Sequence, residues 1–366
     1  MVTDILILAG GFGERLWPAS GINSPKQFLK LDGNLSFLQQ SLLRSLYLKP
    51  TGKIIIITRL GLENTVAEQC RELSGNLDSE TAAKLHSDVI IVAEPKSRHT
   101  TAPIVLACHY LKMTSPDIRH SILVLTSDHI IGPLEAFRND VEKAHQSAEK
   151  GHFITFGIQP YEPAVGYGYI ITGEAEKDNP QVYAIKEFKE KPDKQTAEKF
   201  IARGNCRWNS GMFAFMADFF LEELKKCTPE VYDAFTLIPE GTVPSLDSID
   251  GIQMLHSWPE AEKAYESTPA IAVDKSIAEK TKNAYSVLAT FSWDDVGTWD
   301  SFEKHFHNKT ENAILAGSEN CFVYSDIPVA ICGLDDVTVV IKNGKALVMR
   351  KGCSSLVREA AKHFSD

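Results

Sequence analysis

The sequence of 366 residues has no closely spaced cysteine pair, no excess of positive charge and no long hydrophobic run. Its seven cysteines are scattered, with no C-x-x-C pair, which favours reduced thiols in a cytoplasmic protein over a disulfide scaffold. No apolar run reaches the roughly 18 residues that a membrane-spanning helix needs. The net charge of −10 argues against nucleic acid or an anionic membrane as the main partner. We therefore expect a cytoplasmic globular protein whose partners include no nucleic acid and no membrane.

Several common catalytic motifs are also missing. The sequence has no G-x-S-x-G nucleophile turn and no pair of histidines at metal-binding spacing. The glycine-rich segment after the first predicted strand lacks the third glycine of a dinucleotide-binding turn, because Leu16 stands there. It also lacks the G-K-[ST] ending of a nucleoside-triphosphatase loop, because Glu14 and Arg15 follow Gly13. A nucleotide ligand then has to be bound in another way.

The segment LAGGFGERLWPASGINSPKQF, residues 8–28, combines glycines with two kinds of cation. Gly10, Gly11 and Gly13 allow backbone N–H groups to approach an anion closely. Arg15 offers a planar fork of donors, and Lys26 offers a mobile point charge. Glycines alone are equally typical of a tight turn followed by a solvated loop. The two cations beside them favour phosphate binding.

Strand and helix patterns alternate through the first half of the chain. Buried strands are predicted over residues 5–8, 54–58, 89–92, 122–126 and 153–158, and helices after Ser36 and over 64–73, 100–112 and 134–149. Such alternation predicts an α/β fold with a mostly parallel sheet and right-handed crossovers. Ligands of these sheets lie beyond the carboxyl ends of the strands. The glycine segment, Glu94 and Asp128 all follow such ends.

The pattern changes twice in the second half. After about residue 160 it is mixed, with strands predicted over residues 208–216 and 284–291. After about residue 308, short strands are predicted over residues 313–315, 321–324, 329–331, 337–341 and 346–349, with glycines between several of them. We expect a small all-β appendage there, built either as turns of a β-helix or as a meander. No strict repeat is visible.

Two acidic positions far apart in the sequence follow predicted strands. Asp128 ends the segment LTSD, and Asp294 and Asp295 follow Trp293. A lone aspartate at such a place is as often a helix cap as a metal ligand, but two together suit Mg²⁺ that also takes phosphate oxygens. In an extended backbone Asp294 and Asp295 point to opposite sides. We expect Asp295 to bind the metal and Asp294 to be structural.

The segment FKEKP ends a short strand that begins near residue 182. Pro192 disfavours helix at Lys191, so we expect the strand end to stay extended and the side chains to alternate between its faces. Glu190 can then accept hydrogen bonds from sugar hydroxyls and Lys191 can meet a phosphate. Without further context, a solvated charged edge is the commoner explanation.

Three other segments offer ligand-binding groups, each with a simpler structural alternative. Asn209 beside a tryptophan suits carbohydrate hydroxyls, or it forms a capped turn over a core tryptophan. Gly168 brings backbone close to a ligand or starts a turn before a strand. Arg98 with Thr100 and Thr101 opens a helix where an anion can bind, or the threonines are ordinary N-caps.

Taken together, these segments resemble the bacterial mannose-1-phosphate guanylyltransferases, also called GDP-mannose pyrophosphorylases. The resemblance covers roughly residues 4–300 and consists of motifs in order: LAGGFGERLWPAS with SPKQF, AEPKSRHTTAPI, LTSDHII, FGIQPYEPAVGYGYI, FKEKP, WNSGMFAF, AVDKSIAEK and WDDVGTWD. It implies a Rossmann-like nucleotidyltransferase core over residues 1–300 with a mixed, mostly parallel sheet. It also implies a small C-terminal β domain over residues 308–366, through which a homodimer forms.

The resemblance implies transfer of GMP from GTP to mannose 1-phosphate, with Mg²⁺ as cofactor. In that reaction Arg15, Lys26, Asp128, Lys191 and Asp295 would be catalytic, and Asp128 and Asp295 would hold the metal. The nucleotide would be bound by Gly10, Gly11, Gly13, Glu94, Arg98 and Thr101. The sugar phosphate would be bound by Gly168, Glu190, Lys191 and Asn209, with Asp274 as a further candidate.

The chain departs from the family pattern at three points. His99 stands where the family usually has asparagine, and Lys275 where it usually has an aromatic residue. Many relatives continue into an isomerase domain, whereas this sequence ends at Asp366, so we expect no isomerase activity. Two alternative functions stay open: the same chemistry on a heptose or hexose phosphate with GTP or UTP, or a non-catalytic sensor of nucleotide sugars. Binding alone does not need a paired-carboxylate metal site, which argues against the sensor.

Overall fold

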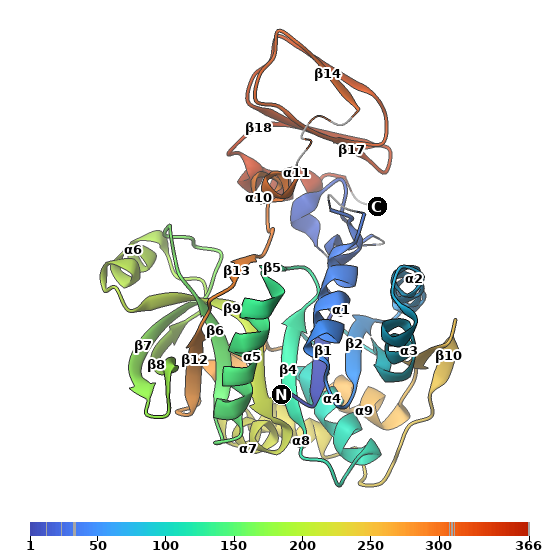
Figure 1. Cartoon of the computed structure of the whole chain (residues 1–366), viewed down its shortest axis with the longest axis vertical. Coiled ribbons are helices and arrows are strands. Elements are labelled where there is room, and N and C mark those ends of the chain that lie inside the picture. Colours follow the sequence, from blue (N-terminus) through green and yellow to red (C-terminus); the bar gives the residue numbers. More distant parts are fainter. Residues whose placement is uncertain are drawn as a thin grey trace. The chain divides into compact units, whose positions relative to one another are not determined.

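The computed structural model describes residues 1–364 apart from residues 12, 23, 32, 33, 307, 309 and 311. Figure 1 shows its helices and strands, labelled where there is room. The chain folds into two compact units, and each is described by itself. The first unit comprises Met1–Gly10, Ser41–Thr126 and Ile131–Trp293, and the second comprises Gly11–Gln40, Ser127–Ile130 and Asp294–Asp366.

An eleven-stranded sheet forms the first unit, in the order β10-β11-β3-β2-β1-β4-β9-β6-β12-β8-β7. Neighbouring strands from β11 to β4 are parallel, whereas β9 is antiparallel to both β4 and β6. The strands are β1 (Asp4–Leu8), β2 (Ile54–Arg59), β3 (Val89–Glu94), β4 (Ser121–Thr126), β6 (Phe153–Ile158), β7 (Tyr169–Glu176), β8 (Asn179–Lys189), β9 (Cys206–Met216), β10 (Asp247–Ile249), β11 (Ile252–Leu255) and β12 (Ala284–Leu288).

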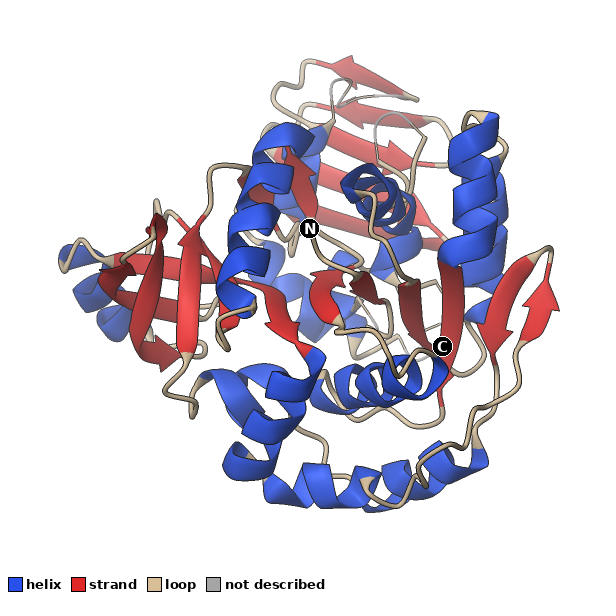
Figure 2. Ribbon diagram, turned by 60° about the horizontal axis from the view of Figure 1, so that its bottom comes forward, coloured by secondary structure: helices blue, strands red, loops and turns tan. Residues whose placement is uncertain are grey.

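Helices flank this sheet (Figure 2). They are α1 (Phe37–Leu48, whose first turn belongs to the second unit), α2 (Glu63–Ser74), α3 (Ser79–Asp88), α4 (Thr101–Thr114), α5 (Leu134–Ala148), α6 (Lys194–Ala202), α7 (Ala217–Cys227), α8 (Pro229–Phe235), α9 (Pro259–Ser267) and the π-helical turn η3 (Asp274–Ala278). Helix α4 is buried along most of its length and contributes to a large apolar cluster with residues of β1 to β4. The apolar β-branched strands therefore lie in the core, as their composition predicts. None of the helices in the described part of the chain is long and apolar enough to cross a membrane.

The predicted elements of the first 158 residues are all present, with only small shifts at their ends. Ser36 begins α1 with a reciprocal pair of hydrogen bonds, because the Gln39 N–H donates to its Oγ and its own N–H donates to Gln39 Oε1. Sequence reading missed α3, whose polar residues carry no strong apolar period. Its signal was Asp78, which accepts hydrogen bonds from the N–H groups of Glu80 and Thr81.

The C-terminal strands of the second unit wind as a short β-helix. Strand β14 (Ala313–Ala316) pairs in parallel with β16 (Val329–Cys332), and β15 (Phe322–Ser325) pairs in parallel with β17 (Val337–Lys342). Hydrogen bonds between the coils join residues 16 positions apart, as in Asn320 Nδ2 to Asp336 Oδ1 at 2.6 Å. Strand β18 (Lys345–Arg350) then runs antiparallel to β17. Of the two predicted alternatives, the β-helix is confirmed and the meander is wrong.

The rest of the second unit packs short helical turns around an apolar cluster. These turns are η1 (Glu14–Leu16), η2 (Lys26–Phe28), α10 (Trp299–Phe302), η4 (Glu303–His305), η5 (Ser354–Leu356) and α11 (Val357–Ala361). Leu16 and Trp17 of the glycine-rich segment lie in one cluster with Trp299 and Phe322, and Trp299 Nε1 donates to the carbonyl of Trp17 at 2.9 Å. Because the glycine-rich segment packs with the C-terminal residues, the two compact units have other bounds than the predicted domains 1–300 and 308–366. Those ranges stay a prediction about functional domains.

Two short strands, β5 (Ile130–Gly132) and β13 (Ser292–Asp294), pair in a small sheet of their own. Both lie where the chain passes from one unit to the other. An acidic candidate lies next to each strand in the sequence, because Asp128 is two residues before β5 and Asp295 directly follows β13.

Candidate active site

Lys26 joins the two acidic positions of the second unit. Its Nζ lies 2.9 Å from both the carbonyl oxygen and Oδ2 of Asp128, and it also donates to the carbonyl oxygen of Asp295. The Lys26 side chain is only 7% exposed, and its ammonium lies over the ring of Phe37. Pro25 precedes it with an extended backbone, as its ring requires. Residues from three distant parts of the sequence are thus gathered around one ammonium group.

Asp128 is held in its charged form. Desolvation raises the pKa of its carboxyl group, but the charges of Lys26, His129 and Arg15 outweigh that effect, so that the pKa falls below its usual range. About a third of the side chain, 35%, remains exposed. Asp128 is therefore an ionised carboxylate with access to a ligand.

Asp295 and Asp294 face different partners in the turn after β13. Asp295 Oδ1 accepts the N–H of Gly297 at 3.1 Å. A Cβ atom at Gly297 would lie 2.8 Å from Asp295 Oδ2 and 3.0 Å from Arg15 Nη1, so a side chain there would crowd both charged groups. Asp294 instead bonds to Ser301 and His305. The arrangement agrees with a structural Asp294, while the metal-binding role of Asp295 stays a prediction.

The oxygen atoms around Lys26 fit a hard divalent cation. Mg²⁺ prefers carboxylate and other oxygen ligands, and it usually completes its shell with water and substrate phosphates. In this structure, oxygens of Asp128 and Asp295 already converge on one positive group, the Lys26 ammonium. Among the described residues, no three or more His, Cys, Asp or Glu side chains form a metal cage. Of the oxygens around Lys26, one belongs to the Asp128 carboxylate and the other two are backbone carbonyl oxygens, and both kinds are ligands that Mg²⁺ accepts.

The three glycines of the N-terminal segment have different surroundings. Gly13 has a φ of 67°, and a Cβ atom there would lie 2.6 Å from both the N and the Cβ of Lys26, so only glycine fits. Gly10 belongs to the first unit, where a Cβ would lie 3.7 Å from Glu94 Oε2. A Cβ at Gly11 would meet none of the described atoms within 4 Å. Their phosphate-binding role stays a prediction.

Glu94 ends β3 in a buried position of the first unit. Its Oε1 accepts the N–H of Arg98 at 3.3 Å. Burial raises the pKa of Glu94 to about 8, against smaller opposing effects of Arg98 and Tyr265. The Arg98 guanidinium donates to the carbonyl oxygens of Tyr265 and Glu266, at 3.0 and 3.2 Å. It therefore tethers the end of α9, and its contact with a nucleotide stays a prediction.

Thr101 and its neighbours anchor the start of α4. The Thr101 side chain is fully buried, and its hydroxyl lies 2.8 Å from Ser276 Oγ. The Thr100 hydroxyl accepts the N–H of Val273 at 2.9 Å rather than an N–H of its own helix. Thr100 thus holds the residue before η3 and Thr101 holds η3 itself, and neither side chain acts as the ordinary N-cap that was one alternative. The contact of Thr101 with base or ribose stays a prediction.

The five residues expected on the sugar side lie together in the first unit. Asn209 Nδ2 donates to Asp274 Oδ1 at 2.8 Å, and the Asn209 N–H donates to the carbonyl of Gly168 at 2.8 Å. A Cβ at Gly168 would lie 2.6 Å from Glu190 Oε2. Lys191 Nζ and Glu190 Oε1 form an ion pair at 2.9 Å. The cluster presents carboxylate, amide and ammonium groups side by side, and such groups can bond to hydroxyl and phosphate oxygens.

Known proteins resemble this chain over most of its length. The family model described as nucleotidyl transferase matches residues 5–312. A mannose-1-phosphate guanylyltransferase of Escherichia coli (strain K12) is 34% identical over 368 residues, covering 98% of this chain and 73% of the relative. One from Salmonella montevideo is 36% identical over 370 residues, with the same two coverages. This chain belongs to the mannose-1-phosphate guanylyltransferase family.

Solved structures support the same fold. The crystal structure named mannose-1-phosphate geranyltransferase from Thermus thermophilus has a TM-score of 0.80 and 28% identity, and the match covers 99% of each chain. The structure named UDP-glucose pyrophosphorylase complexed with UDP-glucose has a TM-score of 0.51 and 14% identity over 83% of this chain and 97% of that one, which shows the fold alone. The predicted family and the predicted α/β nucleotidyltransferase fold with a C-terminal β domain are confirmed.

One local expectation for this guanylyltransferase-family chain is wrong. Strand β8 does not continue in extended form to Pro192, because it ends at Lys189 and Lys191 has a φ of 46°. Pro192 disfavours the right-handed helical region at Lys191, but the chain leaves the strand through the left-handed region instead of staying extended. Glu190 and Lys191 consequently meet in an ion pair rather than pointing to opposite faces.

Asp274 has a second signature of a binding group. Burial and the nearby charge of Glu190 raise the pKa of its carboxyl to about 6, against the opposing effects of Asn209 and Lys191. Sequence reading missed Thr155, whose hydroxyl donates to Asn209 Oδ1 at 2.7 Å and thereby turns the amide nitrogen toward Asp274. A threonine inside an apolar strand carries no signal of such a role.

The two residues that depart from the family pattern, His99 and Lys275, have surroundings that the structure describes. His99 has a φ of 58°, and histidine, like asparagine, is enriched in this left-handed region. The backbone at that position therefore suits either residue. Lys275 is exposed in η3, one residue after Asp274.

Proposed function

We propose that this chain transfers GMP from GTP to α-D-mannose 1-phosphate and releases pyrophosphate. The observation that supports it most is the convergence of Asp128 and Asp295 oxygens on the Lys26 ammonium, with Arg15 beside Asp295. Such a group of charges suits transfer between two anions. The choice of substrates rests on the names of the relatives, which are mannose-1-phosphate guanylyltransferases. The product, GDP-mannose, places the chain in GDP-mannose biosynthesis.

The reaction needs no nucleophile from the protein. An oxygen of mannose 1-phosphate attacks the α-phosphorus of GTP in line, and the bond between that phosphorus and pyrophosphate breaks. Repulsion between the two anionic substrates is the main obstacle. Arg15, Lys26 and Lys191 offset that charge and hold the reacting groups in position.

We assign Mg²⁺ to the carboxylates of Asp128 and Asp295. When bound, Mg²⁺ neutralises phosphate charge and polarises the phosphorus that is attacked. The depressed pKa of Asp128 keeps that carboxylate ionised and ready to bind the cation. Lys26 already balances the negative charge of Asp128, so the carboxylate is oriented before any cation arrives.

The remaining predicted residues divide between the two substrates. Gly10, Gly11 and Gly13 serve the triphosphate, and Glu94, Arg98 and Thr101 serve the rest of the nucleotide. On the sugar side, Glu190, Asn209 and Asp274 bond to hydroxyl groups, while Lys191 meets the phosphate and Gly168 allows close approach. The contacts within each cluster support these assignments, since one partner fixes the next.

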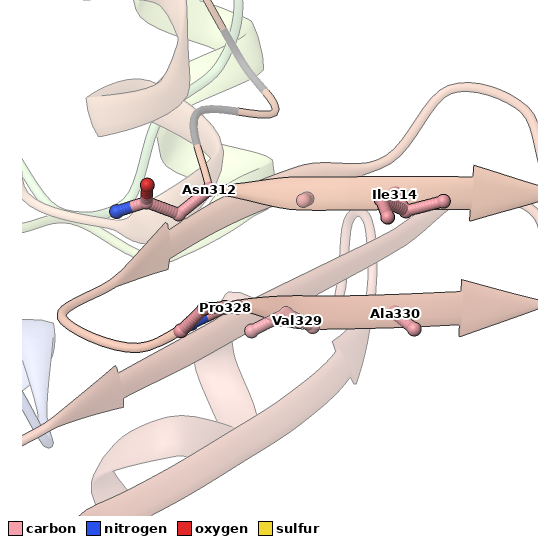
Figure 3. A pocket seen from close by; sticks show the side chains of 6 residues that line it. Asn312, Ile314, Pro328, Val329 and Ala330 are labelled. Atoms are coloured by element: carbon pink, nitrogen blue, oxygen red, sulfur yellow. The ribbon is translucent and has the colours of Figure 1, made fainter.

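We further propose a cytosolic homodimer that forms through the C-terminal β domain. Strands β14 and β16 border a shallow groove of about 430 Å³ (Figure 3), lined by Asn312, Ala313, Ile314, Pro328, Val329 and Ala330. Within the described residues, each of these strands pairs only with the other, so the outer edges are open to a second copy. Ile314 is 73% exposed on this sheet. The seven free thiols suit the reducing cytosol.

A pyrophosphate-release assay tests the function directly. Purified chain with Mg²⁺ is offered each of GTP, UTP, ATP and CTP together with mannose, glucose or heptose 1-phosphate, and the nucleotide sugar is identified by mass. We expect GTP with mannose 1-phosphate to react fastest. A faster reaction of another pair would replace the proposed substrates. Tight GDP-mannose binding with no pyrophosphate from any pair would show a sensor instead.

Two variants test the assigned charges in the same assay. Lys26→Met and Asp295→Asn each remove one preorganised charge, so we expect kcat to fall about a hundredfold or more in each. Asp326→Asn is the matched control, because Asp326 pairs with Lys342 on the β-helix surface. Near-normal rates for the first two variants, with the fold intact by circular dichroism, would contradict the catalytic assignment.

A further inference from the structure

Asp294 is the acidic residue of the turn that the proposed chemistry does not use, yet it is heavily bonded. Its Oδ1 accepts the hydroxyl of Ser301 at 2.7 Å and the N–H of Val296 at 2.7 Å. Its Oδ2 lies 2.9 Å from His305 Nε2. Ser301 belongs to α10 and His305 to η4, so two helical turns hold this carboxylate in place.

Val296, two residues later, has a conformation that valine rarely adopts. Its φ is 45°, in the left-handed region, where the branched Cβ is crowded by the backbone. The side chain is fully buried in the apolar cluster that includes Trp299 and Phe302. Packing and the hydrogen bond from Val296 N–H to Asp294 Oδ1 together stabilise this unfavourable backbone.

The same backbone reversal sets the direction of Asp295. Immediately after Val296, the N–H of Gly297 turns back to Asp295 Oδ1 at 3.1 Å. The Asp295 carbonyl oxygen accepts from Lys26, and the Arg15 guanidinium lies beside the Asp295 carboxylate. The chain therefore makes two consecutive turns here. In each turn an aspartate carboxylate accepts the N–H of the residue two positions later, and both turns contain the strained Val296.

We propose that Asp294 is a positioning residue: by holding Val296 in the left-handed conformation, it aims the Asp295 carboxylate at the divalent cation. The inference rests on the proposed function, because it takes Asp295 as a cation ligand. The structural alternative is that Asp294 only ties α10 and η4 to the turn. That role predicts lost stability without any change in cation binding.

A double-mutant cycle separates the two roles. Asp294→Ala removes the bond to Val296, and Val296→Gly removes the strain, since glycine adopts positive φ without penalty. We expect Asp294→Ala to lower kcat about tenfold and to leave the KM of both substrates within about twofold of the parent value. The free-energy cost of one residue in the left-handed region is large enough for a tenfold change. In the Val296→Gly background, Asp294→Ala should lower kcat by less than about twofold. Asp294→Asn keeps an oxygen for the Val296 N–H and should stay near the parent rate.

Binding of Mn²⁺, followed by electron paramagnetic resonance of the free ion, gives a readout besides activity. Asp294→Ala should raise the Mn²⁺ dissociation constant about tenfold, and Val296→Gly should cancel most of that change. Asp78→Ala is the matched control: it removes the N-cap of α3 and lowers the melting temperature, with no effect on Mn²⁺ binding.

Each outcome decides the inference. Unchanged Mn²⁺ affinity in Asp294→Ala, or an equal loss of affinity with and without Val296→Gly, overturns it while leaving the proposed function intact. A parent chain that makes no GDP-mannose refutes the proposed function, and the Mn²⁺ cycle then still decides whether Asp294 positions Asp295. A parent chain that binds no Mn²⁺ overturns the inference directly.

Discussion

Two carboxyl groups of the candidate site, those of Asp128 and Glu94, carry opposite pKa shifts according to the cations beside them. Asp128 has Lys26, His129 and Arg15 close by, and its pKa is lowered although desolvation acts the other way. Glu94 is desolvated with weaker compensation, and its pKa rises to about 8. A lowered pKa suits a cation ligand, which must be ionised. A raised pKa marks a carboxyl group whose charged form is destabilised by burial, which is common at functional sites.

The raised pKa of Glu94 predicts a pH-dependent gain from Glu94→Gln. Between about pH 4.5 and pH 8, Glu94 carries a proton in the folded chain but has lost it in the unfolded chain. The free energy of unfolding therefore falls as pH rises through that range. Glutamine carries no such proton, and a tenfold difference in acid dissociation constant corresponds to about 1.4 kcal/mol. We expect Glu94→Gln to be about 3 kcal/mol more stable than the parent at pH 8.5, with little difference at pH 5.

Urea unfolding at the two pH values measures this effect, with exposed Glu68→Gln as the control. We expect Glu94→Gln to bind GTP more weakly than the parent chain. The carboxyl group that lowers stability would then be the one that binds the nucleotide. An equal effect of the substitution at both pH values would contradict the buried, protonated Glu94.

At the scale of elements, the sequence predicts what depends on local period and composition. The buried parallel strands are β-branched runs between polar breaks, and their bounds could be read directly. The 16-residue period of the β-helix could not be recognised in the sequence, because only the turn positions repeat the same type of residue. Gly317 and Gly333 are such a pair, as are Asn320 and Asp336, and all four have positive φ. The strand residues between them share only apolar character.

Only those residues of the candidate site that belong to sequence motifs could be predicted. Lys26, Asp128 and Asp295 were identified from sequence, and the structure brings their atoms together. Partners that lie far away in sequence and inside ordinary elements were missed. Thr155 is one, and Tyr265, whose backbone carbonyl accepts from Arg98, is another. Such contacts depend on the tertiary fold and leave no local pattern.

The start of β4 is tied to the start of β1 by a buried ion pair. His120 Nδ1 lies 2.7 Å from Asp4 Oδ2, and both side chains are almost fully buried. Desolvation lowers the pKa of His120, but the hydrogen bond and charge of Asp4, with nearby carbonyl groups, raise it overall. Stability from this pair is fully present below the unfolded histidine pKa of about 6.5 and is lost as pH rises through the higher folded value.

Asp4→Asn should therefore destabilise the chain more at pH 6 than at pH 9. We expect a loss of about 3 kcal/mol at pH 6, because an uncompensated buried imidazolium is left, and a smaller loss at pH 9. Thermal unfolding across that pH range measures it. His120→Gln is the companion variant, and its stability should not show the pH dependence of this pair. A loss from Asp4→Asn that is constant between pH 6 and 9 would mean that His120 is neutral in the fold.

At the scale of the whole molecule, net charge and the exposed β-helix sheet act against each other. Each copy carries a net charge of −10, so two copies repel one another, most strongly at low salt. The open edges of β14 and β16 and the exposed Ile314 favour association instead. A homodimer through this sheet should therefore tighten as salt is added.

Ile314→Lys tests that balance. The substitution adds a desolvated charge at the proposed contact, so we expect the mass by light scattering to fall from about twice 40.5 kDa to the mass of one chain. Val348→Lys is the matched control, because Val348 is also exposed but lies on β18 of the other sheet. If Val348→Lys alone dissociates the dimer, the contact uses the β15-β17-β18 sheet. If the parent chain is a monomer at every salt concentration, no dimer forms, and the open edges of β14 and β16 are tolerated because these strands are short and each copy carries a large negative charge.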